Sequence, residues 1–246
     1  MATPRTNEPA PTFPASEIGF LNLNADLGEG AGEDDAILAH VDSASVGCGV
    51  HAGSVSITIA TVARCRALGV EVGAHPGYDD RSNFGRIEVP IPVDEIEALV
   101  AFQVAGLAAL GPIAYVKPHG ALYRRCQHDQ VAADALARVA RQYQTGLVGQ
   151  PGLEIIAAAQ RAGIPGYREG FADRRVLADG SLAPRHEPGA VLDPEHAVLQ
   201  AMQMAKSGRY DTICIHGDSP GAGQVAAAVR RALDAAGIAT APLAAR

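Results

Sequence analysis

The sequence contains no tryptophan, and aromatic residues make up only 4% of its 246 positions. It has no apolar run approaching the roughly 20 residues that a membrane-spanning helix needs. Basic residues are in the minority, with 20 Lys and Arg against 27 Asp and Glu and a formal net charge of -7. A chain of this charge is not expected to bind nucleic acid or an anionic membrane surface. We therefore expect neither as a partner.

Cysteine is scarce as well, and none of the four cysteines belongs to a CxxC pair. Cys48 and Cys214 lie in apolar, strand-like runs, where a reduced thiol behaves as a small hydrophobic side chain. Residues 1–19 are rich in Pro, Ala, Thr and Glu and lack the apolar segment of a secretory signal. These features predict a disordered tail over 1–19 and a reduced, cytoplasmic protein.

Familiar nucleotide and metal motifs are also missing, because the chain has no GxGxxG fingerprint, no Walker phosphate loop and no HExxH. What it does have is 48% hydrophobic residues, which is enough for a sizeable core. A chain of 246 residues exceeds the usual domain size, but barrels of this length often form one domain. We expect a single barrel domain over 20–246.

Short apolar runs alternate with segments of helical periodicity along the chain. Strands are predicted at 20–24, 45–49, 70–74, 113–117, 146–148, 166–168 and 212–215. The main helices are predicted at 55–68, 92–110, 129–143, 153–162, 194–206 and 224–236, with Ile59 and Val131 on inward faces. Short connections between alternating strands and helices imply parallel strands with the helices outside.

Polar side chains follow most of these strands. Six of them, each after a different strand, are Asp26, His51, His75, His119, Glu169 and His216. In a barrel the functional groups gather on the loops after the strands, whereas an open sheet concentrates them near one switch point. The distribution therefore predicts an α/β fold, an irregular seven-stranded parallel (β/α) barrel, with a shared catalytic or metal site at one rim. A polar loop at 178–189 is long enough to act as a lid.

Lys117 ends the fourth predicted strand, and His119 follows two positions later. Pro118 disfavours helix at Lys117, so both residues are expected in extended or turn backbone. A lysine beside an imidazole suits a group that polarises a carbonyl next to an acid or base. One chemistry that fits is metal-assisted hydrolysis, with imidazoles and a carboxylate as ligands. The other is metal-free attack on an amide with Asp or His as base, and the residues alone leave both open.

Several motifs taken together resemble the LamB/YcsF family. They lie at 22–29, 48–53, 73–78, 84–86, 116–123, 171–174 and 213–218, in the family's order. The resemblance implies a barrel related to glycoside hydrolases and polysaccharide deacetylases. The characterised members are A subunits of prokaryotic 5-oxoprolinase, which implies ATP-dependent opening of the cyclic amide 5-oxo-L-proline to L-glutamate. It also implies partner subunits B and C, with ATP as a co-substrate that those partners handle.

The resemblance also implies roles for individual residues. The catalytic candidates are Asp26, His51, His75, Lys117, His119, Glu169, Asp173 and His216. The substrate-binding candidates are Asn24, Glu29, Arg86, Tyr123, Arg174 and Asp218. We expect Lys117 near the substrate carbonyl and Asp26 or His119 as the base, and we leave open whether a divalent metal is bound.

This chain departs from the family pattern at several positions. Ser45 stands where Asn is usual, Ser54-Val55 replaces Asp-Pro, Ile87 replaces a second Arg, and Arg124 replaces Asn. Two alternatives to the lactam-opening subunit therefore stay open. One is a stand-alone metal-dependent deacetylase that acts on carbohydrate, and the other is a non-catalytic, substrate-carrying subunit.

Overall fold

The computed structural model describes residues 21–177 and 180–244. The tail predicted over 1–19 lies outside the described residues, as do Phe20 at the start of the first predicted strand and positions 178–179 of the predicted lid. Within the described ranges, no helix is long and apolar enough to cross a membrane.

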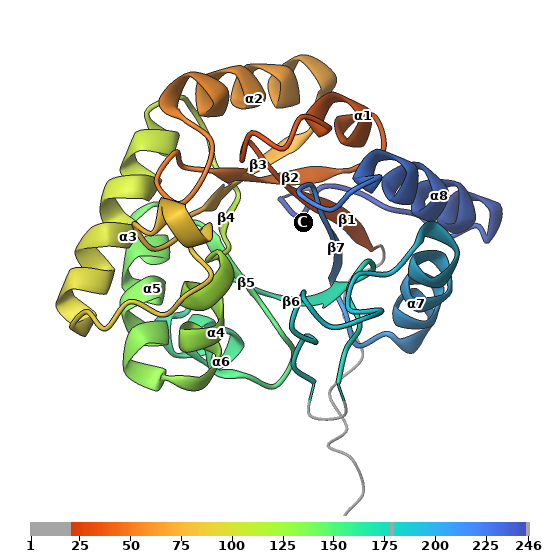
Figure 1. Ribbon diagram of the computed structural model, residues 1–246. Coiled ribbons are helices and arrows are strands. Elements are labelled where there is room, and N and C mark those ends of the chain that lie inside the picture. Colours follow the sequence, from red (N-terminus) through yellow and green to blue (C-terminus); the bar gives the residue numbers. More distant parts are fainter. Residues whose placement is uncertain (1–20, 178–179, 245–246) are drawn as a thin grey trace, which may run out of the picture.

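Parallel strands close into a barrel in the order of the sequence (Figure 1). The strands are β1 (Asn22–Leu27), β2 (Ser43–Gly47), β3 (Glu71–His75), β4 (Tyr115–Val116), β5 (Gly146–Gly149), β6 (Gly166–Phe171) and β7 (Thr212–His216). Strand β7 closes the barrel against β1, and this register sets Asp26 opposite His216. The predicted seven-stranded parallel barrel is confirmed.

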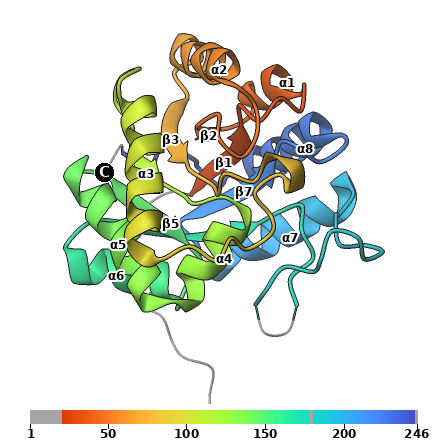
Figure 2. The same cartoon turned by 60° about the vertical axis from the view of Figure 1, so that its left-hand side comes forward.

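Helices surround the barrel on its outside (Figures 1 and 2). They are α1 (Asp34–Leu38), α2 (Val55–Leu68), α3 (Val93–Ala108), α4 (Gly120–His128), α5 (Gln130–Gln142), α6 (Glu154–Ala162), α7 (Pro194–Ser207) and α8 (Ala222–Ala235), with a 3₁₀ turn at Arg81–Asn83. Helix α2 has the predicted bounds because Ser54 caps its first turn and Gly69 ends it in the left-handed conformation.

Helix α4 has no counterpart among the helices predicted from the sequence. It is only nine residues long and begins at Gly120, directly after the Lys117–His119 stretch. Its N-cap residue, His119, makes no side-chain capping bond, so the usual sequence signal for a helix start is missing. The helix turns Tyr123 and Gln127, one turn apart, toward the barrel rim.

Strand β1 shows how the barrel interior is built. Asn22 and Asn24 form hydrogen bonds to side chains of neighbouring strands, whereas Leu23 and Leu27 belong to the hydrophobic core. Successive side chains of a strand face opposite sides, so polar residues fill the barrel and apolar residues pack toward the helices. The strand predicted at 20–24 shares 22–24 with β1, but β1 continues to Leu27, because alternation rather than a continuous apolar run defines it. For the same reason β6 extends beyond the predicted Arg168 to Phe171.

The predicted inward positions of two helical residues are wrong. Ile59 is 48% exposed and Val131 is 59% exposed. The buried face of α2 is made instead by Thr58, Thr61, Val62 and Cys65. Small and polar side chains suit the buried face of α2 because it lies close to the barrel. Hydrophobicity alone therefore predicts the wrong face of the helix.

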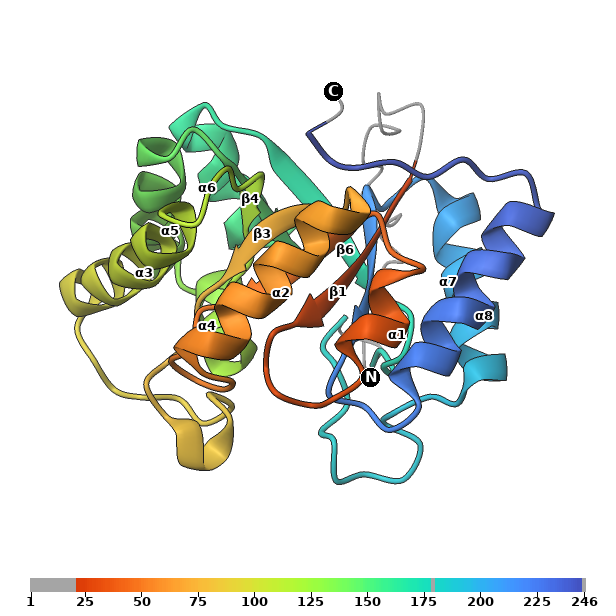
Figure 3. The ribbon, with the colours of Figure 1, turned by 90° about the horizontal axis from the view of Figure 1, so that it is seen from above.

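The C-terminal segment packs across the end of the barrel where strands begin (Figure 3). Leu243 is fully buried in a small cluster with Tyr115, Val148 and Tyr167. The backbone N–H groups of Leu243 and Ala244 donate to the carboxylate of Glu71, at 2.9 and 2.7 Å. The opposite rim, at the carboxyl ends of the strands, carries the functional groups.

Candidate active site

A pocket of about 410 Å³ opens at the carboxyl ends of the strands. Predicted site residues that line it are Asp26, His75, Arg86, Lys117, His119, Tyr123, Arg174 and His216. Residues 180–185 of the predicted lid line it too. The other predicted site residues, Asn24, Glu29, His51, Glu169, Asp173 and Asp218, contact one another or side chains that line the pocket. The strand ends therefore bring the predicted residues together.

Lys117 is a buried cation of the site, with only 2% of its surface exposed. Its Nζ atom lies 2.7 Å from Oδ1 of Asp26, 2.8 Å from Oε1 of Glu169 and 3.0 Å from Sγ of Cys214. Burial alone would lower the pKa of Lys117, but Asp26, Cys214 and Glu169 raise it well above its ordinary value. Lys117 is therefore an ammonium ion at neutral pH.

The two carboxylates that hold Lys117 differ in their acidity. Burial acts to raise the pKa of Asp26, but the nearby His75 and Lys117 outweigh it and lower that pKa. Burial raises the pKa of Glu169 more than Lys117 lowers it. Asn24 Nδ2 lies 3.3 Å from one oxygen of Glu169, and the Tyr123 hydroxyl donates to the other at 3.1 Å. Asn24 and Tyr123, expected to bind substrate, thus hold a site carboxylate in place.

Four buried side chains form a second cluster beside Lys117: Glu29, His51, His75 and His119. Their candidate ligand atoms all lie within 4.8 Å of one another. Oε1 of Glu29 is 3.0 Å from Nε2 of His51, 3.1 Å from Nδ1 of His119 and 3.7 Å from Nε2 of His75. The rings of His51 and His119 stack with centroids 4.0 Å apart. Glu29, expected to bind substrate, lies at the centre of this group.

The hydrogen bonds of two of these rings fix which nitrogens face the cluster. Nδ1 of His75 lies 2.8 Å from the Lys117 carbonyl, and Nε2 of His119 lies 2.8 Å from the Phe84 carbonyl. A carbonyl only accepts, so both nitrogens carry hydrogen. In an uncharged ring the remaining nitrogen is an acceptor, and these two nitrogens lie 3.0 Å apart. Two acceptors at this distance need a proton or a cation between them.

A divalent cation fits this cluster. Metal-binding histidines commonly donate their other ring N–H to a backbone carbonyl, as His75 and His119 both do. Burial lowers the pKa of His75 to about 3, so the ring is neutral, as a ligand must be. Burial also lowers the pKa of His51, whose Nδ1 atom is buried without a partner in the described part of the chain. Imidazoles with one carboxylate are the donors that zinc and similar ions prefer.

An aspartate–histidine pair joins the loop after β6 to the end of β7. Nδ1 of His216 lies 2.9 Å from Oδ1 of Asp173, whose second oxygen accepts from Ser219 at 3.3 Å. Burial acts to raise the pKa of Asp173, but His216 outweighs it and lowers that pKa. The ring of His216 stacks on Phe171 and lines the pocket. An ionised Asp173 therefore fixes Nδ1 of His216 as the donor and leaves Nε2 for proton transfer.

Sequence reasoning misses three polar contributors to the site. The apolar run around Cys214 indicates a core thiol, yet its sulfur contacts Lys117. Arg185 lies in a polar loop that carries no motif, yet it lines the pocket and binds Asp218 at 2.8 Å. Gln127 lies on the unpredicted helix α4, is 2% exposed, and has no hydrogen-bond partner for its amide among the described residues.

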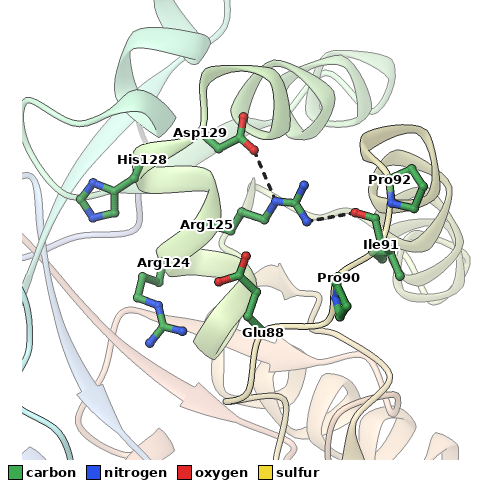
Figure 4. Close-up of a pocket in the computed structure, with 8 residues that line it drawn as sticks. All are labelled: Glu88, Pro90, Ile91, Pro92, Arg124, Arg125, His128 and Asp129. Atoms are coloured by element: carbon green, nitrogen blue, oxygen red, sulfur yellow. Dashed lines mark hydrogen bonds and ion pairs between the residues drawn. The ribbon is translucent and has the colours of Figure 1, made fainter.

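A second hollow lies outside the rim, between the loop before α3 and helix α4 (Figure 4). Of its two arginines, Arg124 is exposed and Arg125 is already bound by Asp129 at 3.4 Å and by the Ile91 carbonyl at 3.0 Å. His128, which also lines this hollow, is exposed. Since this hollow has no buried acid–base group among its lining residues, the chemistry belongs to the rim pocket.

Comparison with known proteins agrees with the motifs. Residues 21–246 match the LamB/YcsF family. The chain belongs to this family. It is 42% identical over 243 residues to the 5-oxoprolinase A subunit of Chloroflexus aurantiacus, covering 89% of this chain and 96% of that protein. It is 42% identical over 244 residues to the 5-oxoprolinase A subunit of Streptomyces coelicolor, covering 89% and 98%.

Solved structures of this fold include a lactam utilization protein and more distant enzymes. The lactam utilization protein of Thermus thermophilus superposes with a TM-score of 0.82 and 38% identity, over 90% of this chain and 99% of that one. A family 4 carbohydrate esterase of Streptomyces lividans superposes with a TM-score of 0.54 and 10% identity, over 90% and 91%. The second likeness shows the fold alone, and it carries no information on substrate.

Proposed function

We propose that this chain is the A subunit of an ATP-dependent 5-oxoprolinase, which opens the lactam of 5-oxo-L-proline to L-glutamate. The observation that carries the proposal is the buried ammonium of Lys117, which lines the rim pocket between Asp26 and Glu169. A fixed positive charge of this kind stabilises the oxyanion that forms when an amide carbonyl is attacked. The relatives are named as A subunits of 5-oxoprolinase, and these names support the same substrate class.

The contacts of Lys117 suggest where the substrate oxygen binds. The bonds to Asp26 and Glu169 are charge-assisted, whereas the bond to the Cys214 sulfur is to a weak acceptor. In this proposal the lactam oxygen replaces Cys214 as the third acceptor. Asp26 then keeps the ammonium in place, and its lowered pKa makes it a poor base at neutral pH.

Proton transfer is therefore assigned to His216 rather than to Asp26 or His119. Nε2 of His216 takes a proton from the attacking water as the water oxygen bonds to the lactam carbon. When the carbon–nitrogen bond breaks, the same imidazolium gives that proton to the leaving nitrogen. Asp173 holds the ring in one tautomer and stabilises its charge, as the 2.9 Å contact with Nδ1 allows.

His51, His75, His119 and Glu29 are assigned to a divalent ion. Such an ion would polarise a bound carbonyl or lower the pKa of a bound water when present. The residues themselves hold the base of the pocket rigid, because His75 and His119 are tied to the carbonyls of Lys117 and Phe84.

The names of the relatives describe one part of a multi-subunit enzyme. We assign ATP to partner subunits B and C, since the chain has neither a Walker loop nor a GxGxxG fingerprint. The test is a coupled assay for glutamate with 5-oxoproline, ATP and purified B and C subunits. Glutamate that appears only when this chain and ATP are both present supports the proposal. Its absence with partners that are active beside a known 5-oxoprolinase A subunit contradicts it.

The second candidate function is a metal-dependent deacetylase acting on carbohydrate. The buried Glu29–histidine cluster favours it, because hydrolysis with a bound metal needs no ATP or partner. Acetate release from an acetylated sugar oligomer by the purified, metal-loaded chain would support this alternative. A non-catalytic, substrate-carrying subunit would instead bind 5-oxoproline without turnover when B, C and ATP are supplied.

A further inference from the structure

A group of arginines reaches the rim pocket from three separate segments. Arg86 follows β3, Arg174 follows β6, and Arg185 lies in the loop before α7. We call these three residues the arginine group. Asp218 forms ion pairs with both Arg86 and Arg185, and it is largely buried, with 12% of its side chain exposed. One carboxylate therefore forms ion pairs with two guanidinium ions.

Arg174 has no ion pair among the described residues, although it is only 6% exposed. Its Nη2 atom donates to the Ala183 carbonyl at 2.6 Å and its Nε atom to the Ala190 carbonyl at 3.3 Å. The nearest carboxylate in sequence, Asp173, is already bonded to His216 and Ser219. The guanidinium of Arg174 is thus held rigidly by neutral groups, at a position that lines the pocket.

The electrostatics of this group favour an anion. Burial, and after it the positive charge of Arg185, lowers the pKa of Arg174 to about 10, although the nearby charges of Asp173 and Asp218 act to raise it. Burying excess positive charge is costly unless a negative charge accompanies it. The described contacts use only a few N–H groups of the three side chains, and a guanidinium has further donors in a planar fork. That fork matches a carboxylate or a phosphoryl group.

We propose that Arg174 and Arg185, with Arg86, form a subsite for an oxyanion carried by the substrate, and that Asp218 aligns Arg86 and Arg185. If the proposed function holds, the oxyanion is the carboxylate of 5-oxoproline or a phosphoryl group attached to the substrate. The subsite fixes the orientation of the ring, because the same pocket is lined by Lys117 and His216. An uncharged lactam lacks this anchor.

Calorimetric titration of the purified full chain tests the subsite without partners or ATP. The ligands are 5-oxoproline, 2-pyrrolidinone, which is the same ring without a carboxylate, and inorganic phosphate. The variants are Arg185→Gln and Arg174→Gln, each checked for the circular dichroism spectrum of the unchanged chain. The matched control is Arg138→Gln, because Arg138 pairs with Glu97 on the outer helices, with 55% of its side chain exposed.

We expect Arg185→Gln to weaken the binding of 5-oxoproline at least about tenfold, as for other hydrogen bonds to charged groups. The affinity of Arg138→Gln for 5-oxoproline should not change, and neither should the affinity of any variant for 2-pyrrolidinone. If Arg185→Gln binds phosphate more weakly but binds 5-oxoproline unchanged, the subsite is supported and its ligand is the phosphoryl group. The proposal is overturned if both anions bind Arg185→Gln and a folded Arg174→Gln as tightly as the unchanged chain.

This test is separate from that of the proposed function. If the variants bind anions unchanged and the chain releases glutamate from 5-oxoproline, the subsite proposal is contradicted and the proposed function is supported. If the variants bind phosphate more weakly but no glutamate is released beside active partners, the subsite proposal is supported and the proposed function is contradicted.

Discussion

Nε2 of His75 and Nδ1 of His119 lie 3.0 Å apart, although each ring uses its other nitrogen to bond a backbone carbonyl. Neither carbonyl can give a proton back to the ring. The two facing nitrogens therefore share a proton or bind a cation, and Oε1 of Glu29 adds negative charge 3.1 Å from His119. The end of β3, the residue before α4 and the loop after β1 together supply these three side chains.

The first prediction concerns metal binding by this cluster. Added Zn²⁺ should raise the thermal unfolding midpoint of metal-free protein, because a ligand at 100 times its dissociation constant stabilises the folded state by about 2.7 kcal/mol. His75→Ala should abolish most of the shift. His196→Ala is the matched control, because His196 is exposed and pairs with Asp193 at 2.8 Å. Equal shifts in His75→Ala and the unchanged chain would contradict the metal site.

The second prediction concerns the stability role of Lys117. Lys117→Met should lower the free energy of unfolding by about 3–5 kcal/mol, because it leaves the buried carboxylates of Asp26 and Glu169 without their cation. Urea unfolding followed by circular dichroism measures this loss. Adding Glu169→Gln should recover part of it by removing one unpaired charge. An unfolding curve for Lys117→Met that matches the unchanged chain would refute this account.

The third prediction concerns catalysis by His216. In the coupled glutamate assay, His216→Gln should lower kcat by about 10²–10⁴, the range for loss of a general acid or base. Its affinity for 5-oxoproline should change little, since the oxyanion and the carbonyl are bound elsewhere in the pocket. A variant with unchanged kcat would assign the proton transfer to another residue.

The fourth prediction concerns pH. The folded-state pKa of Asp173 is lowered, so its contribution to stability is full above its unfolded pKa of about 3.9 and is lost as pH falls through the folded value. At pH 7, Asp173→Asn should be less stable than the unchanged chain. The difference in unfolding free energy should shrink as the pH is lowered below about 4. Denaturant titrations across this pH range measure the difference in unfolding free energy. A difference that grows as the pH falls would contradict the lowered pKa of Asp173.

The fifth prediction concerns the glycine at the start of α4. A Cβ on Gly120 would lie 2.6 Å from the Gly85 carbonyl oxygen, in a backbone with φ of 53°. Gly120→Ala should displace Gly85 and the neighbouring Phe84 carbonyl, which accepts from His119. Gly163→Ala is the control, since Gly163 has φ of 67° and open space where the added methyl group would lie. Gly163→Ala should lower the free energy of unfolding only through left-handed backbone strain, by about 1–2 kcal/mol. It should still be stabilised by Zn²⁺ as the unchanged chain is.

A Gly120→Ala chain that is as stable as Gly163→Ala, with the same Zn²⁺ response, would show that the Gly85 contact has no role. Both variants carry the same kind of backbone strain, so the difference between their unfolding free energies isolates the steric contact.

Much of the fold could be predicted because local chemistry and overall architecture agree. Helix α2 has a serine cap and a glycine stop, and its bounds are the predicted ones. The alternation of strands with helices implies parallel strands, and polar side chains after most strands favour a barrel over an open sheet. Helix α4 escapes prediction because it is short and has no side-chain cap.

The sequence by itself determined the parallel barrel and the rim position of Asp26, Lys117, His119 and His216, because strand order and residue alternation are local properties. Only the tertiary structure decided which of these residues touch. It placed Glu29 among three histidines, gave Lys117 two carboxylates and a thiol, and brought Arg185 to Asp218. These contacts depend on barrel closure and loop packing between residues far apart in the chain, and no local pattern records those distances.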